Sequence, residues 1–237
     1  MNFKSIFSIA AFFMFAFQLL AQEKKETNEM LKNGAFFKLS INIPDNNFSK
    51  IPNDVYIGSI TTKRGIGFDI GSMFFLNKIS LGKYLTLGID ITYLSVNYTM
   101  LKGEHKIDGV YGQKIDEYDY RHLTFSTQFG SFLTTQLSKE TAIDIGFKVG
   151  PTLDYFYRFH SPENQFYENP GVSLGTSIML VPNLVFRYNM LLVGLEYLIG
   201  SAQHTDYRKR NPNSTQEAIE NIQVPLNQFR ILVGVKF

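Results

Sequence analysis

Apolar and polar side chains alternate along long segments of the chain, and the last segment shows the pattern most clearly. Within residues 228–237, the polar residues Gln228, Arg230 and Lys236 alternate with Phe229, Ile231, Val233, Val235 and Phe237. Side chains of a β-strand point alternately to its two faces, so this segment has one apolar and one polar face. The pattern predicts an amphipathic strand that ends with an aromatic residue.

The same alternation recurs in seven earlier segments, which gives eight predicted strands: 34–43, 63–76, 84–100, 117–137, 141–159, 171–186, 190–201 and 228–237. The connections at 44–62, 102–116, 160–170 and 202–223 are long and polar, whereas those at 77–83, 138–140 and 187–189 are short. Long and short connections therefore take turns along the chain. In an up-and-down barrel this places every long loop at one mouth. We expect an all-β fold, an eight-stranded antiparallel up-and-down transmembrane β-barrel.

The polar face of these strands carries ionisable residues, which decides between a membrane barrel and a soluble one. It is rich in glycine and includes Asp69, Asp90, Asp144, Lys148, Glu196 and Arg230. A soluble core does not bury many unpaired charges, but charges inside a narrow barrel can pair with one another. We expect these six residues to form an interior polar network and the apolar face to contact lipid. A gate or narrow ion path is the functional alternative, and a soluble barrel with an apolar interior is the structural one.

The sequence pattern near the N-terminus predicts that the chain has three parts. Lys4 precedes an apolar run at 6–20, and the small residue Ala21 is followed by a charged stretch. This pattern predicts a signal peptide at 1–21, a flexible periplasmic leader at 22–33 and an outer-membrane β-barrel at 34–237. An uncleaved membrane anchor is the alternative, although the run is short for a spanning helix.

Composition excludes several classes of site. The chain has no cysteine, which removes disulfides, thiolate metal sites, cysteine nucleophiles and a lipidated cysteine anchor. Its formal net charge is +2, and no basic stripe indicates a nucleic-acid partner. No stretch indicates a cofactor or a metal-ligand set, so we expect neither.

The four histidines are the candidate catalytic groups, and all lie in or near the predicted long loops: His105, His122, His160 and His204. Three have a polar neighbour that a catalytic pair would need, namely His204 with Asp206, His160 with Ser161 and His122 with Asp119. Solvated loop histidines are the commoner case, so we expect a protein that is not an enzyme.

The last predicted loop carries a basic triplet followed by a helix-capping pattern. Arg208, Lys209 and Arg210 are suited to contact lipopolysaccharide phosphates, or they form a solvated charge run. The pattern Ser214-Thr215-Gln216-Glu217 matches a capping box and predicts a short helix at 215–221.

The signal peptide, the eight amphipathic segments and the terminal Phe237 together resemble the small outer-membrane barrels of Gram-negative bacteria. The OmpA/OmpX type is the general model, and the PorT-like outer-membrane β-barrel family is a closer resemblance. The resemblance implies that the barrel-insertion machinery reads the last strand through Phe229, Ile231, Val233, Val235 and Phe237. It also implies a bacterial outer-membrane location with outer-membrane lipid and lipopolysaccharide as partners.

We therefore expect a non-enzymatic, porin-like outer-membrane barrel with a structural or surface-interaction role, in which long extracellular loops contact lipopolysaccharide or a protein partner. A lipid-A-modifying or proteolytic barrel enzyme that uses loop histidines is one alternative. An accessory component of a protein secretion complex, which the PorT-like resemblance implies, is another.

Overall fold

A computed structural model describes residues 31–45, 59–81, 85–109, 112–159, 172–208 and 217–237. The signal peptide, nearly all of the predicted leader, His160, Ser161, Lys209 and Arg210 lie outside these residues. The described chain forms eleven strands: β1 Gly34–Pro44, β2 Ser59–Thr62, β3 Gly65–Ser80, β4 Leu85–Gly109, β5 Gly112–Gln136, β6 Thr141–Phe159, β7 Val172–Tyr188, β8 Leu191–Leu198, β9 Ser201–Arg208, β10 Glu217–Pro225 and β11 Gln228–Lys236.

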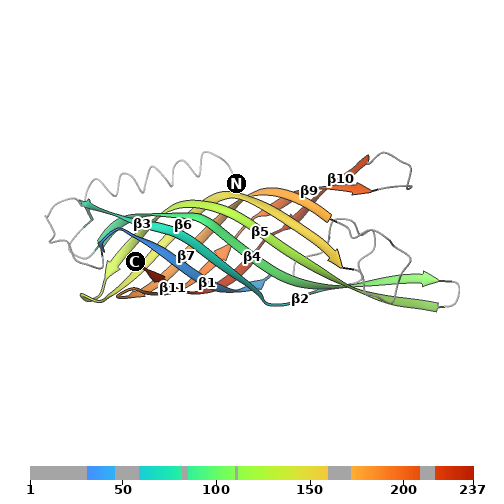
Figure 1. Cartoon of the computed structure of the whole chain (residues 1–237), viewed down its shortest axis with the longest axis horizontal. Coiled ribbons are helices and arrows are strands. Elements are labelled where there is room, and N and C mark those ends of the chain that lie inside the picture. Colours follow the sequence, from blue (N-terminus) through green and yellow to red (C-terminus); the bar gives the residue numbers. More distant parts are fainter. Residues whose placement is uncertain (1–30, 46–58, 82–84, 110–111, 160–171, 209–216) are drawn as a thin grey trace.

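Eight of these strands close into a barrel in which every neighbouring pair is antiparallel. The order is β7-β6-β5-β4-β3-β1-β11-β8, and pairing of β8 with β7 closes the ring. The first and last strands lie side by side, with Ile41 opposite Ile231. The predicted fold class, an eight-stranded antiparallel barrel, is confirmed. Figure 1 shows the strands tilted around the elongated barrel.

Two predicted loops are in fact strand hairpins that extend the barrel at one end. The predicted loop at 102–116 belongs to β4 and β5, which pair as far as Gly109 and Gly112. The predicted loop at 202–223 contains β9 and β10, which pair antiparallel and continue β8 and β11 (Figure 1). The helix expected at 215–221 is wrong for residues 217–221, because Glu217 pairs with Arg208 across this hairpin. Cross-strand pairing overrides the local capping signal there.

The short β5–β6 and β7–β8 turns lie at the opposite end of the barrel (Figure 1). The β7–β8 turn contains Asn189 with a φ of 51°, a left-handed conformation that asparagine tolerates better than most residues. The Asn189 N–H donates a hydrogen bond of 2.8 Å to the carbonyl of Glu140 in the β5–β6 turn. This bond joins two of the short turns.

Side chains alternate between the lumen and the outside along each strand, and their polarity is the reverse of a soluble protein's. Ile145, Ile178 and Val233 point outward with exposures of 62%, 70% and 52%. Lys148 and Arg230 point inward with exposures of 0%. Large apolar residues are exposed on all eight strands of the ring, as on β1, β3 and β4.

Glycines on the inner face make room for large aromatic side chains. A Cβ at Gly71 would lie 2.4 Å from the Phe36 ring, and one at Gly88 would lie 2.1 Å from the Phe132 ring. These distances are far below van der Waals contact, so any other residue would displace the ring. The glycine-rich inner face therefore lets phenylalanines fill the lumen.

Within the described ranges, no helix has the length and apolar character needed to span a bilayer.

Candidate functional site

The lumen is the candidate functional site, because most of the buried charges in the described chain meet there. Its middle holds the central ion network, which we define as Lys38, Asp69, Asp90, Lys148, Glu196 and Arg230. These residues come from β1, β3, β4, β6, β8 and β11, so the network links strands around most of the ring. Three cations face three carboxylates, and the network is electrically balanced.

Glu196 is the centre of this network because its two carboxylate oxygens accept from different cations. Lys148 Nζ lies 2.9 Å from Glu196 Oε1, and Arg230 Nη1 lies 3.0 Å from Glu196 Oε2. The other side of the guanidinium reaches Asp69, with Nη2 2.9 Å from Oδ1. Lys38 Nζ lies 3.6 Å from Asp90 Oδ2. Charged pairs excluded from water need such multiple contacts to offset their desolvation.

Hydroxyl and amide groups continue the network toward the end of the barrel that carries the long connections. Arg230 donates to Ser40 Oγ, and Ser40 donates to Asn42 Oδ1 at 2.8 Å. Asn42 then donates to Asn97 at 3.1 Å, and Asn97 donates to Thr124 at 3.2 Å. The chain of hydrogen bonds crosses from β11 through β1 and β4 to β5. It fixes the orientation of the inward polar side chains along this path.

Asp144 does not make its ion pair within the central ion network. It pairs with Arg187 near the short turns, with Arg187 Nη2 2.9 Å from Asp144 Oδ1, and it accepts a 2.6 Å hydrogen bond from Thr134. The Arg187 guanidinium also lies 4.9 Å from the centre of the Phe75 ring. Next to this pair, an aromatic and aliphatic cluster crosses the lumen: Leu31, Phe36, Met73, Phe75, Phe132, Val185 and Leu192.

A second apolar cluster crosses the lumen on the other side of the central ion network. It draws residues from β4 through β10 and from the residue after β10: Leu101, Tyr120, Phe156, Met179, Val181, Leu198, Ala202, Val224 and Leu226. Side chains thus fill the barrel in three zones, apolar, ionic and apolar. An eight-stranded barrel has an interior just wide enough for side chains to fill it, and the described lumen follows that rule.

Beside the second apolar cluster, the two histidines His122 and His204 share one carboxylate. His122 Nε2 contacts Asp154 Oδ1, and His204 Nε2 lies 2.7 Å from Asp154 Oδ2. Ser173 Oγ lies 3.0 Å from His204 Nδ1. The Phe156 ring stacks on His122 with centroids 4.2 Å apart.

Gly175 makes the His204 contact possible. Asp154, Gly175 and His204 lie opposite one another on β6, β7 and β9. The His204 ring reaches Asp154 across the glycine, where an added Cβ would lie 2.5 Å from His204 Nε2. The glycine on the middle strand thus sets which carboxylate the histidine meets.

The structure corrects the predicted histidine pairs. His204 and His122 point into the lumen and both contact Asp154. The side chain of Asp206 lies outside the described residues, and Asp119 is exposed. The pair His160–Ser161 lies outside the described residues, as does the side chain of His105. Sequence reasoning missed Asp154 although it lies ten residues after Asp144 on the same strand, and an even spacing places both on one face.

Lys38 and Arg187 were also missed as members of the interior ion pairs. Lys38 shares the inward face of β1 with Ser40 and Asn42. The alternation of side chains along the strand therefore already indicated that Lys38 points into the lumen. Arg187 was assigned to a turn because the predicted strand ended at residue 186, whereas β7 continues to Tyr188.

Ser173, His204 and Asp154 match the residue types of a hydrolytic triad, but their surroundings differ from those of an active site. The three side chains are buried, with Ser173 only 2% exposed. A serine nucleophile needs space for a substrate carbonyl within bonding distance, and here the imidazole, Phe156 and neighbouring strands enclose it.

Among the described residues, no cluster of histidine, aspartate and glutamate has an arrangement that suits a metal ion.

The outer face of β11 holds the residues predicted as an insertion signal. Ile231 and Val233 are exposed, Phe237 is 69% exposed at the chain end, and Phe229 and Val235 are partly exposed. Arg208 ends β9 in the extended hairpin, whereas its side chain and the rest of the basic triplet lie outside the described part of the chain.

Comparisons with known proteins found fold likeness only. No protein-family model matches the chain, and no curated protein matches it. Among solved structures, the chain is similar to Ail, the attachment invasion locus protein of Yersinia pestis, at 9% identity over 86% of this chain and 97% of that one, with a TM-score of 0.35. A structure of Ail with the heparin analogue sucrose octasulfate matches at 8% identity over the same shares, with a TM-score of 0.37. The backbone structure of Ail in a phospholipid bilayer nanodisc matches at 10% identity over 87% of this chain and 100% of that one, with a TM-score of 0.25.

Proposed function

We propose that this chain is a non-enzymatic outer-membrane β-barrel with a filled lumen, which acts at the cell surface through its extended hairpins. The inverted polarity carries the proposal: charged residues are buried inside the barrel while leucine, isoleucine, valine and phenylalanine cover its outside. Soluble monomers rarely expose continuous apolar surfaces of this extent. A bilayer is the solvent that favours this arrangement, because a closed barrel satisfies every backbone group without water.

Lumen packing supports a structural or interaction role over transport. The central ion network is charge-balanced, so it offers no excess charge to select one sign of ion. Buried apolar clusters lie on both sides of this network. Function then rests with the parts that project from the barrel, namely the β4–β5 and β9–β10 hairpins (Figure 1).

The test is a pair of epitope insertions expressed in a Gram-negative host. One is placed between Gly109 and Gly112, at the tip of the β4–β5 hairpin, and the other replaces Lys139 in a short turn. The proposal expects antibody binding on intact cells for the hairpin insertion and only after outer-membrane permeabilisation for the turn insertion. Binding to neither insertion in a protein that fractionates with soluble material would refute the membrane location.

The last strand is proposed to carry the signal for barrel insertion through Phe229, Ile231, Val233, Val235 and Phe237. Replacing Phe237 with serine is expected to lower the amount of folded protein in the outer membrane, with Phe229→Ser as the comparison within the same face. An unchanged yield of folded Phe237→Ser protein would count against the signal. The basic triplet at 208–210 is proposed to bind lipopolysaccharide phosphate, which alanine replacement of all three residues would test.

Hydrolysis by Ser173, His204 and Asp154 is the second candidate function, because these residues meet within hydrogen-bonding distance. Burial of Ser173 argues against it. A fluorophosphonate probe distinguishes the two functions: the non-enzymatic proposal expects no labelling, whereas labelling that disappears in Ser173→Ala would establish a reactive serine. An accessory role in secretion would appear as a partner cross-linked to the hairpins or turns.

A further inference from the structure

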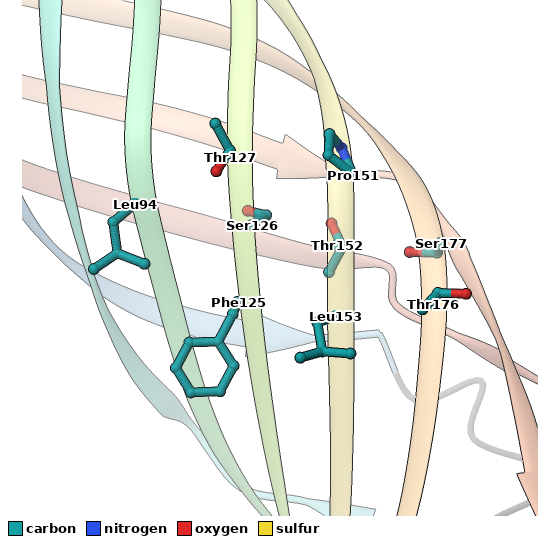
Figure 2. A pocket seen from close by; sticks show the side chains of 9 residues that line it. All are labelled: Leu94, Phe125, Ser126, Thr127, Pro151, Thr152, Leu153, Thr176 and Ser177. Carbon is teal, nitrogen blue, oxygen red and sulfur yellow. The ribbon is translucent and has the colours of Figure 1, made fainter.

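The inner wall of the barrel carries a group of small polar side chains on three neighbouring strands. We call it the polar patch, and it consists of Ser126 and Gln128 on β5, Thr152 on β6 and Ser177 on β7. Thr152 lies opposite Ser126 on one side and opposite Ser177 on the other. Figure 2 shows these three residues in a row behind the strands, whereas Leu153 projects from the outer face. The polar patch therefore faces the lumen.

Three polar atoms of the polar patch have no hydrogen-bond partner among the described residues. They are Gln128 Oε1, Thr152 Oγ1 and Ser177 Oγ, and each atom is buried. Gln128 and Thr152 are only 0% and 3% exposed. The Gln128 amide donates to Ser126 Oγ at 2.9 Å, so the opposite assignment of its two end atoms would leave the nitrogen unpaired instead of the oxygen. In either case a buried polar group without a partner costs free energy.

The polar patch lies where the pairing of β5 with β6 is interrupted. The pairing stops after Ser126 and Thr152 and resumes three residues farther along each strand. Pro151 lies in this interval and has no N–H to donate to the neighbouring strand. Gly150 is the inward-facing residue of the interval on β6, and it contributes no side chain beside Gln128. The lumen wall is therefore built here from a glycine and short polar side chains.

The spacing of the hydroxyl groups fits a bridging water molecule. Side chains directly opposite each other on antiparallel strands have Cβ atoms about 4.5–5.5 Å apart. The hydroxyls of Thr152 and Ser177 make no direct hydrogen bond with each other, but one water about 2.8 Å from each oxygen spans such a separation. Water both donates and accepts, which suits an amide oxygen beside two hydroxyls, and a buried water typically makes about three hydrogen bonds.

The charges around the polar patch favour a neutral occupant. On the inward face of β6, Thr152 lies between Lys148 of the central ion network and Asp154. The central ion network already balances three cations with three carboxylates, and Asp154 contacts two histidines. An added cation would unbalance the network, whereas water adds no charge.

We propose that the polar patch binds buried water in the lumen. Thr152 and Ser177 share one molecule, and water donates a hydrogen bond to Gln128 Oε1. The bound water joins polar side chains of β5, β6 and β7 at the place where the backbone pairing of two of these strands is interrupted. The site does not depend on the membrane location, because it lies inside the closed ring. A sodium ion, which could coordinate the same oxygens, is the competing occupant.

A crystal structure of the purified protein, grown from a lipid mesophase and at a resolution that shows ordered water, is the direct test. The proposal expects a peak of electron density within about 2.6–3.2 Å of both Thr152 Oγ1 and Ser177 Oγ. A lumen without a peak at this place would overturn the site.

Thr152→Val tests the hydrogen bond, because valine keeps the shape of the side chain and removes the hydroxyl. If water bonds to Thr152, the variant loses one hydrogen bond, and the folded-to-unfolded ratio is expected to fall about twofold to tenfold. If Thr152 has no partner at all, the variant removes an unsatisfied group and the ratio rises instead. Urea-induced unfolding in vesicles measures the ratio. An unchanged or higher ratio would overturn the proposal.

A double-variant cycle tests whether Thr152 and Ser177 share one molecule. Ser177→Ala is expected to lower the folded-to-unfolded ratio by a smaller factor in the Thr152→Val protein than in the parent. Ser131→Ala, at an exposed position on the outer face of β5, is the control and is expected to change the ratio by the same factor in both proteins. Equal factors for Ser177→Ala would overturn the shared water.

Replacement of sodium chloride by choline chloride at equal concentration separates water from sodium. With water in the polar patch, the urea midpoint of the parent is expected to respond to this exchange no more than the midpoint of Thr152→Val. A midpoint that falls in choline chloride for the parent but not for Thr152→Val would identify sodium as the occupant and overturn the proposal.

Discussion

Glu196→Gln is the perturbation that tests the central ion network most directly. The native carboxylate accepts from Lys148 at 2.9 Å and from Arg230 at 3.0 Å. A glutamine has one acceptor oxygen, so its NH₂ group must face one of the two cations. Arg230 keeps Asp69 and Ser40 as partners, but Lys148 keeps a weaker 3.4 Å contact to Thr92.

Breaking a buried pair by removing one partner costs about 3–5 kcal/mol. Because part of the network survives, we expect a loss of about 3 kcal/mol, which lowers the folded-to-unfolded ratio by about two powers of ten. Urea-induced unfolding in vesicles would measure it, followed by tyrosine fluorescence, since the chain has 13 tyrosines and no tryptophan.

Glu140→Gln, in an exposed turn, is the matched control and is expected within about 0.5 kcal/mol of the parent. The double variant Glu196→Gln with Lys148→Met removes both partners and should recover part of the loss. A Glu196→Gln protein as stable as the Glu140→Gln control would refute the reasoning that this carboxylate offsets two buried cations.

Three further predictions concern the wall and the lumen. Ile145→Arg places a charge on the lipid-facing surface and should lower the free energy of unfolding in bilayers by about 2–4 kcal/mol. Tyr188→Arg, near the short turns, should lower it by about 1 kcal/mol or less. Equal losses in vesicle-refolding titrations would contradict the placement of Ile145 deeper in the bilayer than Tyr188. Gly175→Ala should displace His204 from Asp154 and destabilise the barrel by about 1–3 kcal/mol, measured by the same urea assay with Thr176→Ala as control; an unchanged midpoint would show that the strand yields at no cost. Planar-bilayer recordings should show no conductance steps, because side chains fill the lumen in three zones; steady ohmic steps would contradict that filling.

The eight strands that close the ring, and the face on which their side chains lie, could be predicted from the sequence because apolar and polar residues alternate with a period of two. The inward position of Lys148 and the outward position of Ile145 are consequences of parity alone. Strand ends could not be predicted in the same way. The 102–116 segment is polar enough to read as a loop, yet β4 and β5 continue through it because each strand hydrogen-bonds the other.

The partners of the interior charges also lay beyond sequence reasoning. Parity places Asp154 in the lumen, but the sequence does not show that β6, β7 and β9 align it with His204 around Gly175. That alignment depends on register, which is a property of the whole ring.

At the proposed membrane location, the β4–β5 hairpin would set the distance between the bilayer and a partner bound at its tip. Leu101 is buried on β4, and the strand continues to Gly109, eight residues or roughly 27 Å farther. Because both strands of this hairpin extend together, the number of residues in each strand determines how far the tip lies from the barrel. Removing two residues from each strand would bring the tip about 7 Å nearer the bilayer and leave every remaining side chain on its original face.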